Sequence, residues 1–234
     1  MMGATSNQNA NLIMISHQNI RGYNTSKPEL QAFLEDHSPD VVTLNETMTK
    51  KGYNYSMPNY TVLTADRNDR QGGGVAIMLR NNLAYEEIDN ITLTQGTDNE
   101  QLTVAIRIGT NQKLFISTVY CPSGHPSMEL IDGLCEDRDQ VILTGDFNSK
   151  HIELGNKVNN GSGLTLLEAT ERNHLTLIND GTPTYIKATS GKEDILDLMF
   201  ISKTIRPYFR DFWVGDNHGS DHFIINGVFS YPPI

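Results

Sequence analysis

Short apolar runs recur along the whole chain, and they constrain the fold more than any other feature. Each run has the length and the Val, Ile, Leu and Phe content of a buried strand. The runs are residues 12–15, 41–44, 60–63, 75–79, 88–93, 102–108, 114–120, 141–143, 175–178, 196–201, 212–214 and 223–229. Few segments show helical spacing. Many strands with few helices predict an α/β fold of two packed mixed sheets flanked by helices.

Three segments carry helix signals. Ser26 and Glu29 are spaced as a capping box, with Pro28 in the first turn and apolar residues following at helical spacing. We predict a second helix from about Ser162 and a shorter one over residues 127–135. The buried side of the second helix is expected to carry Leu164, Leu166, Leu167 and Thr170, with Asn173 near the end.

Size and composition indicate one domain, residues 1–234. No apolar run reaches the length of a bilayer span, so we expect a soluble chain without a membrane partner. We also expect the isolated domain to be a monomer. Residues 1–11 are polar and lack the pattern of a signal peptide. Two cysteines, Cys121 and Cys135, are too few for a disulfide framework and favour a reducing compartment, although one bridge between them stays open.

The formal net charge of −10 argues against a protein that holds nucleic acid mainly through Lys and Arg. The objection weakens if part of the acidic excess surrounds a divalent cation, because the ion would reverse the local field. Plain solubility is the alternative explanation of the charge.

Polar side chains follow several apolar runs at the point where each run ends. In the segment 144–149, Thr-Gly-Asp-Phe-Asn-Ser comes directly after residues 141–143. Ligands collect beyond strand ends in layered α/β folds, so Asp146 and Asn148 would project into a cleft. An ordinary Asx turn is the alternative. Comparable strand boundaries carry Asn19, Gly22, Asn45, Glu46, Thr47, Tyr120 and the segment 219–222.

Asp197 lies inside the apolar segment 196–200, where a lone charge is costly unless it is paired or hydrogen-bonded. Taken singly, each of these polar residues has an ordinary structural explanation. His218 and His222 lie four residues apart, but no helix is expected there to make them a metal pair. The three glycines at 72–74 precede a strand and lack a phosphate-loop Lys, so we expect a flexible turn. The combination of groups is therefore the informative feature.

Taken in order, the motifs resemble those of the endonuclease/exonuclease/phosphatase superfamily, whose members share a four-layered αββα sandwich. The resemblance rests on segments 19–22, 45–47, 120–122 and 145–148, on Asp197 and on segment 220–222. Segments 71–79 and 196–200 are similar to the apurinic-like endonuclease domain of LINE-type, non-LTR retrotransposons. Two other branches of the superfamily fit less well. Its secreted deoxyribonucleases would need an export signal, and its abasic-site repair enzymes usually carry a Trp-Arg-rich segment around the position of Asp197. Neither feature is present in this sequence.

The resemblance implies an endonuclease that nicks one strand of double-stranded DNA and leaves a 3′-hydroxyl. A retrotransposon reverse transcriptase would use that end as primer. Such a domain would form the N-terminal part of a longer polyprotein, with the reverse transcriptase domain as its partner. Its site of action would be the nucleus, reached through the cytoplasm.

Hydrolysis of a phosphodiester requires charge neutralisation, an activated water and help for the leaving alkoxide. Hard oxygen ligands suit Mg²⁺, for which Mn²⁺ would substitute. We assign Glu46 as the first metal ligand, with Asn19 and Asp221 beside it.

The remaining strand-end groups fit catalytic roles. Asp146 would orient or deprotonate the water, and Asn148 would donate its amide to a phosphate oxygen. Tyr120 is similar to the family's phosphate-contacting tyrosine. His222, paired with Asp197, would bind the phosphate as an imidazolium, because a neighbouring carboxylate favours the charged form of histidine.

The segment 184–194 resembles the hairpin that LINE-type endonucleases insert toward the minor groove. A flexible hairpin with solubilising lysines is the alternative. The residues assigned to substrate binding are Arg21, Thr184, Lys187, Lys192 and Ser220. Asp194 and Asn45 depart from the Ser and Gln that the family often has at these positions. Asp194 would repel a nearby phosphate unless a cation such as Lys192 offsets its charge.

Two other functions stay open. A phosphomonoesterase of the same superfamily, acting on inositol phosphates or nucleotides, would keep the core residues but need basic loops, and such basic clustering is absent from the sequence. An inactive relative would serve as a nucleic-acid or protein-binding module, whereas all the main catalytic positions here are filled.

Overall fold

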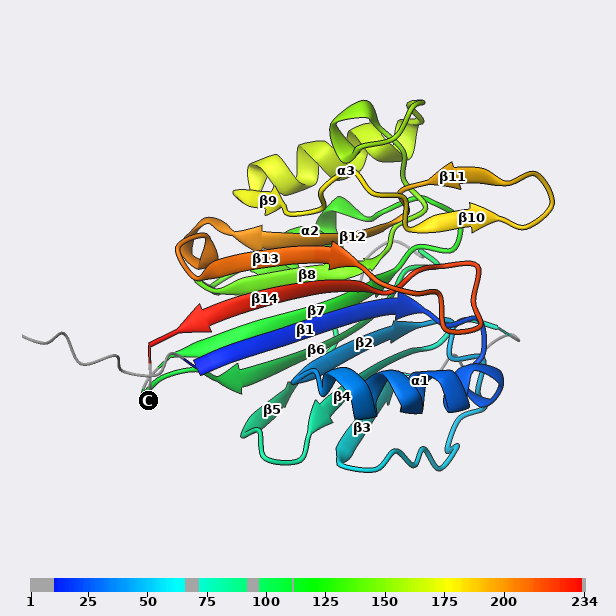
Figure 1. Ribbon diagram of the computed structural model, residues 1–234. Helices are drawn as coiled ribbons and strands as arrows, with labels where there is room; N and C mark the ends of the chain where they lie inside the picture. Colours follow the sequence, from blue (N-terminus) through cyan, green and yellow to red (C-terminus); the bar gives the residue numbers. More distant parts are fainter. Residues whose placement is uncertain (1–10, 66–71, 92–96, 111, 233–234) are drawn as a thin grey trace, which may run out of the picture.

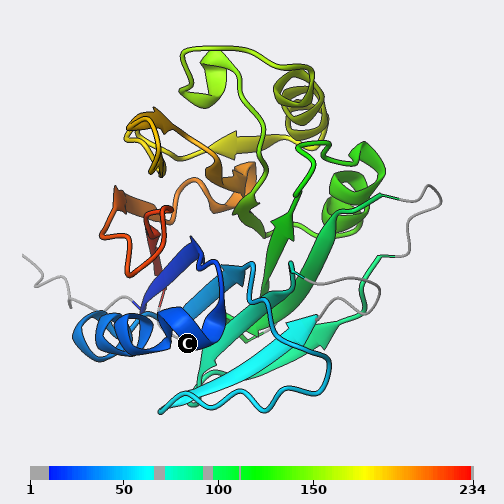
Figure 2. The ribbon, with the colours of Figure 1, turned by 90° about the vertical axis from the view of Figure 1, so that its right-hand side faces the viewer.

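The computed structural model describes residues 11–65, 72–91, 97–110 and 112–232. Two six-stranded mixed sheets face each other at its centre (Figures 1 and 2). The first contains, in spatial order, β13 (Phe209–Val214), β14 (Ile225–Tyr231), β1 (Asn11–Asn19), β2 (Val41–Asn45), β4 (Val75–Arg80) and β3 (Tyr60–Ala65). The second contains β5 (Tyr85–Ile88), β6 (Glu100–Arg107), β7 (Lys113–Tyr120), β8 (Val141–Asp146), β12 (Asp197–Ser202) and β9 (Leu175–Leu177). A separate hairpin, β10 (Tyr185–Lys187) and β11 (Lys192–Asp194), projects beyond the sheets at the right of Figure 1.

Helices cover the outer faces of both sheets (Figure 2). On the first sheet, α1 (Tyr23–His37) packs Leu30 and Phe33 against the strands. On the second, α2 (Met128–Cys135) and α3 (Gly161–Arg172) cover strands β8 and β12. Short 3-10 turns lie at Ile152–Leu154 and Lys203–Ile205. The order helix, sheet, sheet, helix confirms the predicted αββα sandwich.

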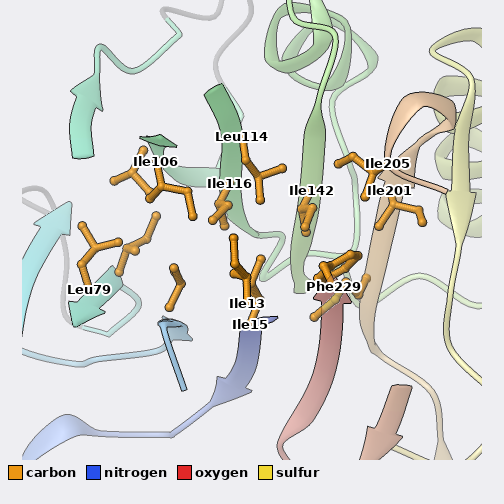
Figure 3. Close-up of a cluster of buried hydrophobic side chains, with 14 of the residues drawn as sticks. Ile13, Ile15, Leu79, Ile106, Leu114, Ile116, Ile142, Ile201, Ile205 and Phe229 are labelled. Carbon is orange, nitrogen blue, oxygen red and sulfur yellow. The ribbon is translucent and has the colours of Figure 1, made fainter. Parts of the chain in front are cut away.

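Alternating aliphatic residues from the inner faces of both sheets form the central core (Figure 3). Ile13 and Ile15 of β1 belong to this cluster together with Ile116 of β7 and Ile142 of β8. Burying an aliphatic side chain of this size contributes about 1.5–3 kcal/mol. Because successive strand residues point to opposite faces, this core fixes the register that brings the polar strand ends to one edge.

Each sheet contains a parallel pair with a helix between its two strands, β1 with β2 and β7 with β8. The carboxyl ends of parallel strands meet at one edge, and the last paired residues are Asn19 with Asn45 and Tyr120 with Asp146. Strand β12 runs antiparallel to β8 and starts at this edge, where Asp197 pairs with Asp146. The fold therefore brings the predicted strand-end groups together.

The predicted start of the first helix was wrong. Helix α1 begins at Tyr23 with Gly22 as its N-cap, and Pro28 lies inside the helix. Ser26 does not cap it, because its Oγ donates to the carbonyl of Ile20 at 2.7 Å. The buried ring of Tyr23 packs on Tyr55 with ring centroids 4.7 Å apart, so tertiary packing extends the helix beyond the local signal.

Predictions for the other elements differ in smaller ways. The helix predicted over residues 127–135 is α2, which begins at Met128 and is capped by the side chain of Ser127. Helix α3 is capped by Asn160, and Leu164, predicted to be buried, is 53% exposed. The strand expected over 88–93 is instead Tyr85–Ile88, which pairs with β6, and residues 92–93 lie outside the described part of the chain. The remaining predicted strands are present with shifted ends.

The structure also bears on the cysteines and on membrane-spanning helices. Cys121 and Cys135 are both free thiols. Within the described residues, no helix combines the length and the apolar character that crossing a membrane requires.

Candidate active site

The polar strand ends surround one open cavity of about 480 Å³. The predicted site residues that line it are Arg21, Glu46, Tyr120, Asp146, Asn148, Lys187, Lys192, Asp221 and His222. Asn19, Asp197, Thr184 and Ser220 lie behind this surface and are buried. We call the buried groups His17, Asp146, Asp197 and His222 the floor of the cavity, and the cations Arg21, Lys150, Lys187 and Lys192 its rim.

Asp146 ends strand β8 at the centre of the floor. Its Oδ2 accepts from Nδ2 of Asn19 at 3.0 Å, and its Oδ1 accepts from the backbone N–H of Asn148 at 3.1 Å. The second bond closes the Asx turn that was the alternative explanation of this segment. The segment therefore forms that turn and also places Asp146 and Asn148 at the cavity. A Cβ at Gly145 would lie 1.8 Å from the carbonyl oxygen of Val119, so only glycine lets the two strands approach here. Burial, followed by the charge of Asp197, raises the pKa of Asp146 to about 7.

Glu46 reaches the cavity from the turn after β2. Its Oε1 accepts from the Tyr120 hydroxyl at 2.6 Å and from Nδ2 of Asn19 at 3.0 Å. Burial and this hydrogen bond raise the pKa of Tyr120, which therefore stays protonated. The backbone of Glu46 is left-handed, with φ of 54°, a conformation that costs about 1–2 kcal/mol. The N–H of Gly22 holds this turn by donating to the carbonyl of Glu46 at 2.8 Å.

The glycine segment at 72–74 supports the same turn. The carbonyls of Gly73 and Gly74 accept from the backbone N–H groups of Met48 and Thr47, at 2.8 and 3.2 Å. All three glycines have positive φ, and strand β4 follows at Val75. The prediction of a turn before a strand, rather than a phosphate loop, is therefore confirmed.

Asp197 and His222 form a buried pair. Nδ1 of His222 lies 2.8 Å from Oδ2 of Asp197. Burial would lower the pKa of His222, but the Asp197 carboxylate outweighs it and raises this pKa to about 9. Burial would conversely raise the pKa of Asp197, but the charge of His222 and the contact with His17 hold it well below its usual range. At neutral pH the pair is therefore an imidazolium and a carboxylate.

The sequence analysis missed His17. This fully buried residue pairs with Thr43 across β1 and β2, and its Nδ1 lies 2.9 Å from the Thr43 hydroxyl. Its Nε2 lies 3.4 Å from Oδ1 of Asp197. Asp197 is thus held between two histidines. The two-residue alternation from Ile13 and Ile15 to position 17 was the available signal, because it places His17 on the same inward face.

Three of the rim cations form ion pairs with carboxylates. Arg21 contacts Asp221 at 2.6 Å, and Lys150 contacts Asp194 at 2.6 Å. Lys192, the predicted partner of Asp194, lies 3.8 Å from it. Lys150 was missed, although it directly follows the 144–149 motif. Asp194 therefore has an offsetting cation, and the nearer of the two lysines is Lys150 rather than the predicted Lys192.

Two predicted substrate-binding residues are corrected. Thr184 is fully buried, and its Oγ1 accepts from the backbone N–H groups of Leu196 and Asp197 at 3.0 Å each. The Ser220 hydroxyl donates to the carbonyl of Asn19 at 2.8 Å and accepts from the N–H of His222 at 3.1 Å. Both hydroxyls therefore hold the backbone at the strand ends around the cavity, and both residues are buried beneath its surface.

The predicted metal ligands differ in how well they fit a divalent cation. Asn19 turns its amide nitrogen toward two carboxylates, while its oxygen accepts from the N–H of Arg21 at 3.2 Å. Among the described residues, no group of three His, Cys, Asp or Glu side chains is arranged to hold a metal. Mg²⁺ needs only one or two carboxylates and keeps several waters, so the Glu46 carboxylate at the cavity fits it.

Comparison with known sequences finds relatives among retrotransposon proteins. A family profile described as endonuclease-reverse transcriptase matches residues 114–226. The chain is 29% identical over 172 residues to the "Probable RNA-directed DNA polymerase from transposon X-element" of Drosophila melanogaster. It is 25% identical over 170 residues to the RNA-directed DNA polymerase from mobile element jockey of the same species. Each match covers 71% of this chain and 18% of the relative, so the chain spans less than a fifth of these curated proteins.

Solved structures share the fold at low sequence identity. The endonuclease domain of TRAS1, a telomere-specific non-LTR retrotransposon, has a TM-score of 0.77 at 18% identity, covering 94% of this chain and 99% of that one. The AP endonuclease LMAP from Leishmania major has a TM-score of 0.75 at 13% identity, with 99% and 92% covered. The 3′-5′ exonuclease NExo from Neisseria meningitidis has a TM-score of 0.70 at 16% identity, with 94% and 100% covered.

These sequence relatives are named as transposon polymerases, and the three solved structures above are described as endonucleases and an exonuclease. The resemblance predicted from the motifs is confirmed: the chain has the four-layered fold of the endonuclease/exonuclease/phosphatase superfamily and is similar to its LINE-type, non-LTR retrotransposon endonucleases.

Proposed function

We propose that this chain is a Mg²⁺-dependent endonuclease that nicks one strand of double-stranded DNA and leaves a 3′-hydroxyl. The observation that carries the proposal is the convergence of three hydrogen-bonded pairs on one cavity. These pairs are Tyr120 with Glu46, Asn148 with Asp146, and His222 with Asp197. Together they provide a carboxylate for a hard cation, a candidate base and a cationic donor for phosphate.

The chain's own residues divide the chemistry among them. Asp146, with its pKa near neutrality, accepts the proton of the attacking water and orients it. The Asn148 amide donates to a nonbridging phosphate oxygen, and the His222 imidazolium neutralises charge on the phosphate. Glu46 would hold the cation, with Tyr120 fixing its carboxylate. A Mg²⁺ ion bound there supplies Lewis-acid stabilisation of the developing charge.

The wider biological setting belongs to the same proposal. The curated relatives are RNA-directed DNA polymerases, which supports a reverse transcriptase domain in the same polyprotein as the partner. That domain would extend the 3′-hydroxyl left at the nick. We propose the nucleus as the site of action, reached through the cytoplasm, and a monomer as the state of this domain alone.

Supercoiled plasmid tests the activity directly. With Mg²⁺ the purified chain is expected to convert supercoiled plasmid into open circles, and a chelator is expected to stop it. A DNA polymerase added afterwards should extend the nicked strand, because extension requires a free 3′-hydroxyl. Glu46→Gln should abolish the reaction without loss of fold, whereas Glu168→Gln, on the exposed face of α3, should retain it. Full activity of Glu46→Gln would refute the metal assignment.

The same assay separates the alternatives. Inositol polyphosphates and an oligonucleotide with a 3′-phosphate are added in parallel reactions. Release of inorganic phosphate without plasmid nicking would replace the proposal with a phosphomonoesterase. DNA binding without turnover of any substrate would favour an inactive binding module.

A further inference from the structure

The carboxylate of Asp221 at the cavity is paired with the guanidinium of Arg21. The Arg21 guanidinium lies 2.6 Å from Oδ2 of Asp221, and both side chains line the cavity together with Glu46. The Arg21 side chain is 55% exposed, whereas that of Asp221 is 15% exposed. The ion pair thus lies at the boundary between the rim and the buried floor.

The backbone holds both partners in place. Arg21 has a left-handed conformation with φ of 46°, and its N–H donates to Oδ1 of Asn19 at 3.2 Å. The carbonyl of Asp221 accepts from the N–H of Ile186 in the hairpin at 3.0 Å. The neighbouring Ser220 hydroxyl donates to the carbonyl of Asn19. Arg21 and Asp221 are therefore brought together by the framework that also places the catalytic groups.

This pairing opposes metal binding at Asp221. A divalent ion on Oδ2 would have to displace the guanidinium or lie beside another positive charge. The other oxygen, Oδ1, is buried and has no hydrogen-bond partner among the described residues. A cation that keeps its waters cannot reach a buried oxygen without shedding them, which Mg²⁺ does reluctantly.

We propose that Arg21 acts as a built-in cation that keeps a divalent ion off Asp221, so that the chain binds a single ion at Glu46. Asp221 then anchors Arg21, and the exposed guanidinium contacts a phosphate of the DNA next to the cavity. The inference deepens the proposed function and rests on it for the identity of the substrate. It replaces the assignment of Asp221 as a metal ligand.

Mn²⁺ binding to the purified chain without DNA tests the inference, with electron paramagnetic resonance to count bound ions. The wild type should bind one Mn²⁺, and Glu46→Gln should lose it. Asp221→Asn should keep one ion with less than a twofold change in Kd. Arg21→Ala should bind a second ion, because Asp221 is then free of the guanidinium. The double variant, Arg21→Ala with Asp221→Asn, should return to one ion. Arg21→Lys keeps the charge and should stay at one ion.

Two ions on the wild type, or loss of the ion in Asp221→Asn, would overturn the inference. So would an unchanged count of one ion in Arg21→Ala. Circular dichroism of each variant establishes that a lost ion does not reflect unfolding. Because the count requires no turnover, a chain that nicks no DNA but follows this pattern would refute the proposed function and leave the inference standing.

DNA binding in a chelator tests the second part. Arg21→Ala should raise the Kd for a duplex about fivefold, which corresponds to ~1 kcal/mol. Arg21→Lys should fall between this variant and the wild type, because lysine keeps the charge but loses the planar guanidinium. Equal affinity of Arg21→Ala and wild type would remove Arg21 from the DNA interface.

Discussion

The floor and the rim of the cavity both contain ion pairs, but these ion pairs differ in burial. On the floor, Asp197 is fully buried between His17 and His222, and its pKa is held low by their proximity. On the rim, Lys192 is 55% exposed and lies 3.8 Å from Asp194. Exposed ion pairs contribute about 0–1 kcal/mol, whereas removing one partner of a buried pair costs about 3–5 kcal/mol. The floor should therefore determine the reaction rate, and the rim should determine DNA affinity.

Between floor and rim, the largest expected effect concerns the buried pair of the floor. His222→Ala and Asp197→Ala should each lower the nicking rate by about 10²–10³-fold, because the phosphate loses a preorganised cation. The double variant should be little slower than either single one, since the residues act as a unit. Rates from single-turnover nicking measure this. Additive losses would contradict a functional pair and weaken the distinction between floor and rim.

The pH dependence of nicking should report two floor residues. The rate should rise with pH through about 7, as Asp146 becomes an ionised base, and fall through about 9, as His222 loses its proton. Outside this window the rate should change about tenfold per pH unit. The residual activity of Asp146→Asn should lack the low-pH limb, and that of His222→Ala should lack the high-pH limb. A flat profile would contradict both roles.

A smaller effect is expected for His17, the floor residue that contacts Asp197 from the first sheet. His17→Ala should lower kcat about tenfold, or ~1.4 kcal/mol, because Asp197 loses one of the two histidines that position it. The KM for DNA should stay unchanged, since His17 is fully buried. His17→Gln, whose amide could donate a hydrogen bond to Asp197, should recover part of the rate. The exposed His125→Ala serves as control. A rise in KM without a fall in kcat would argue against positioning.

The smallest effects belong to the rim. Lys187→Ala and Lys192→Ala should leave kcat near the wild-type value and weaken DNA binding severalfold at low salt. Each should reduce the slope of log Kd against log salt by about 0.9 if the lysine meets one phosphate. Lys203→Ala is the matched control, because Lys203 is exposed and follows the far end of β12. Unchanged slopes would favour the alternative of a solubilising hairpin.

The sequence was most informative where one strand ends in polar chemistry. The segment 144–149 pointed to Asp146 and Asn148 because the apolar run and the polar turn are neighbours in the chain. Local patterns also predicted the short helix over residues 127–135, which the structure has from Met128 to Cys135. The same reasoning failed for Ser26, since a capping box describes only adjacent residues and cannot register the packing of Tyr23 that starts the helix earlier.

The sequence by itself determined the strand-rich α/β architecture and the set of polar groups at the strand ends. Only the tertiary structure decided which of these groups touch. Arg21 meets Asp221 across 200 positions in the chain, and burial commits Thr184 to the backbone rather than to substrate. His17 became part of the site only because the packing of the two sheets placed it beside Asp197. Contacts between residues far apart in sequence, and the burial that shifts their pKa, depend on sheet register, which no local pattern encodes.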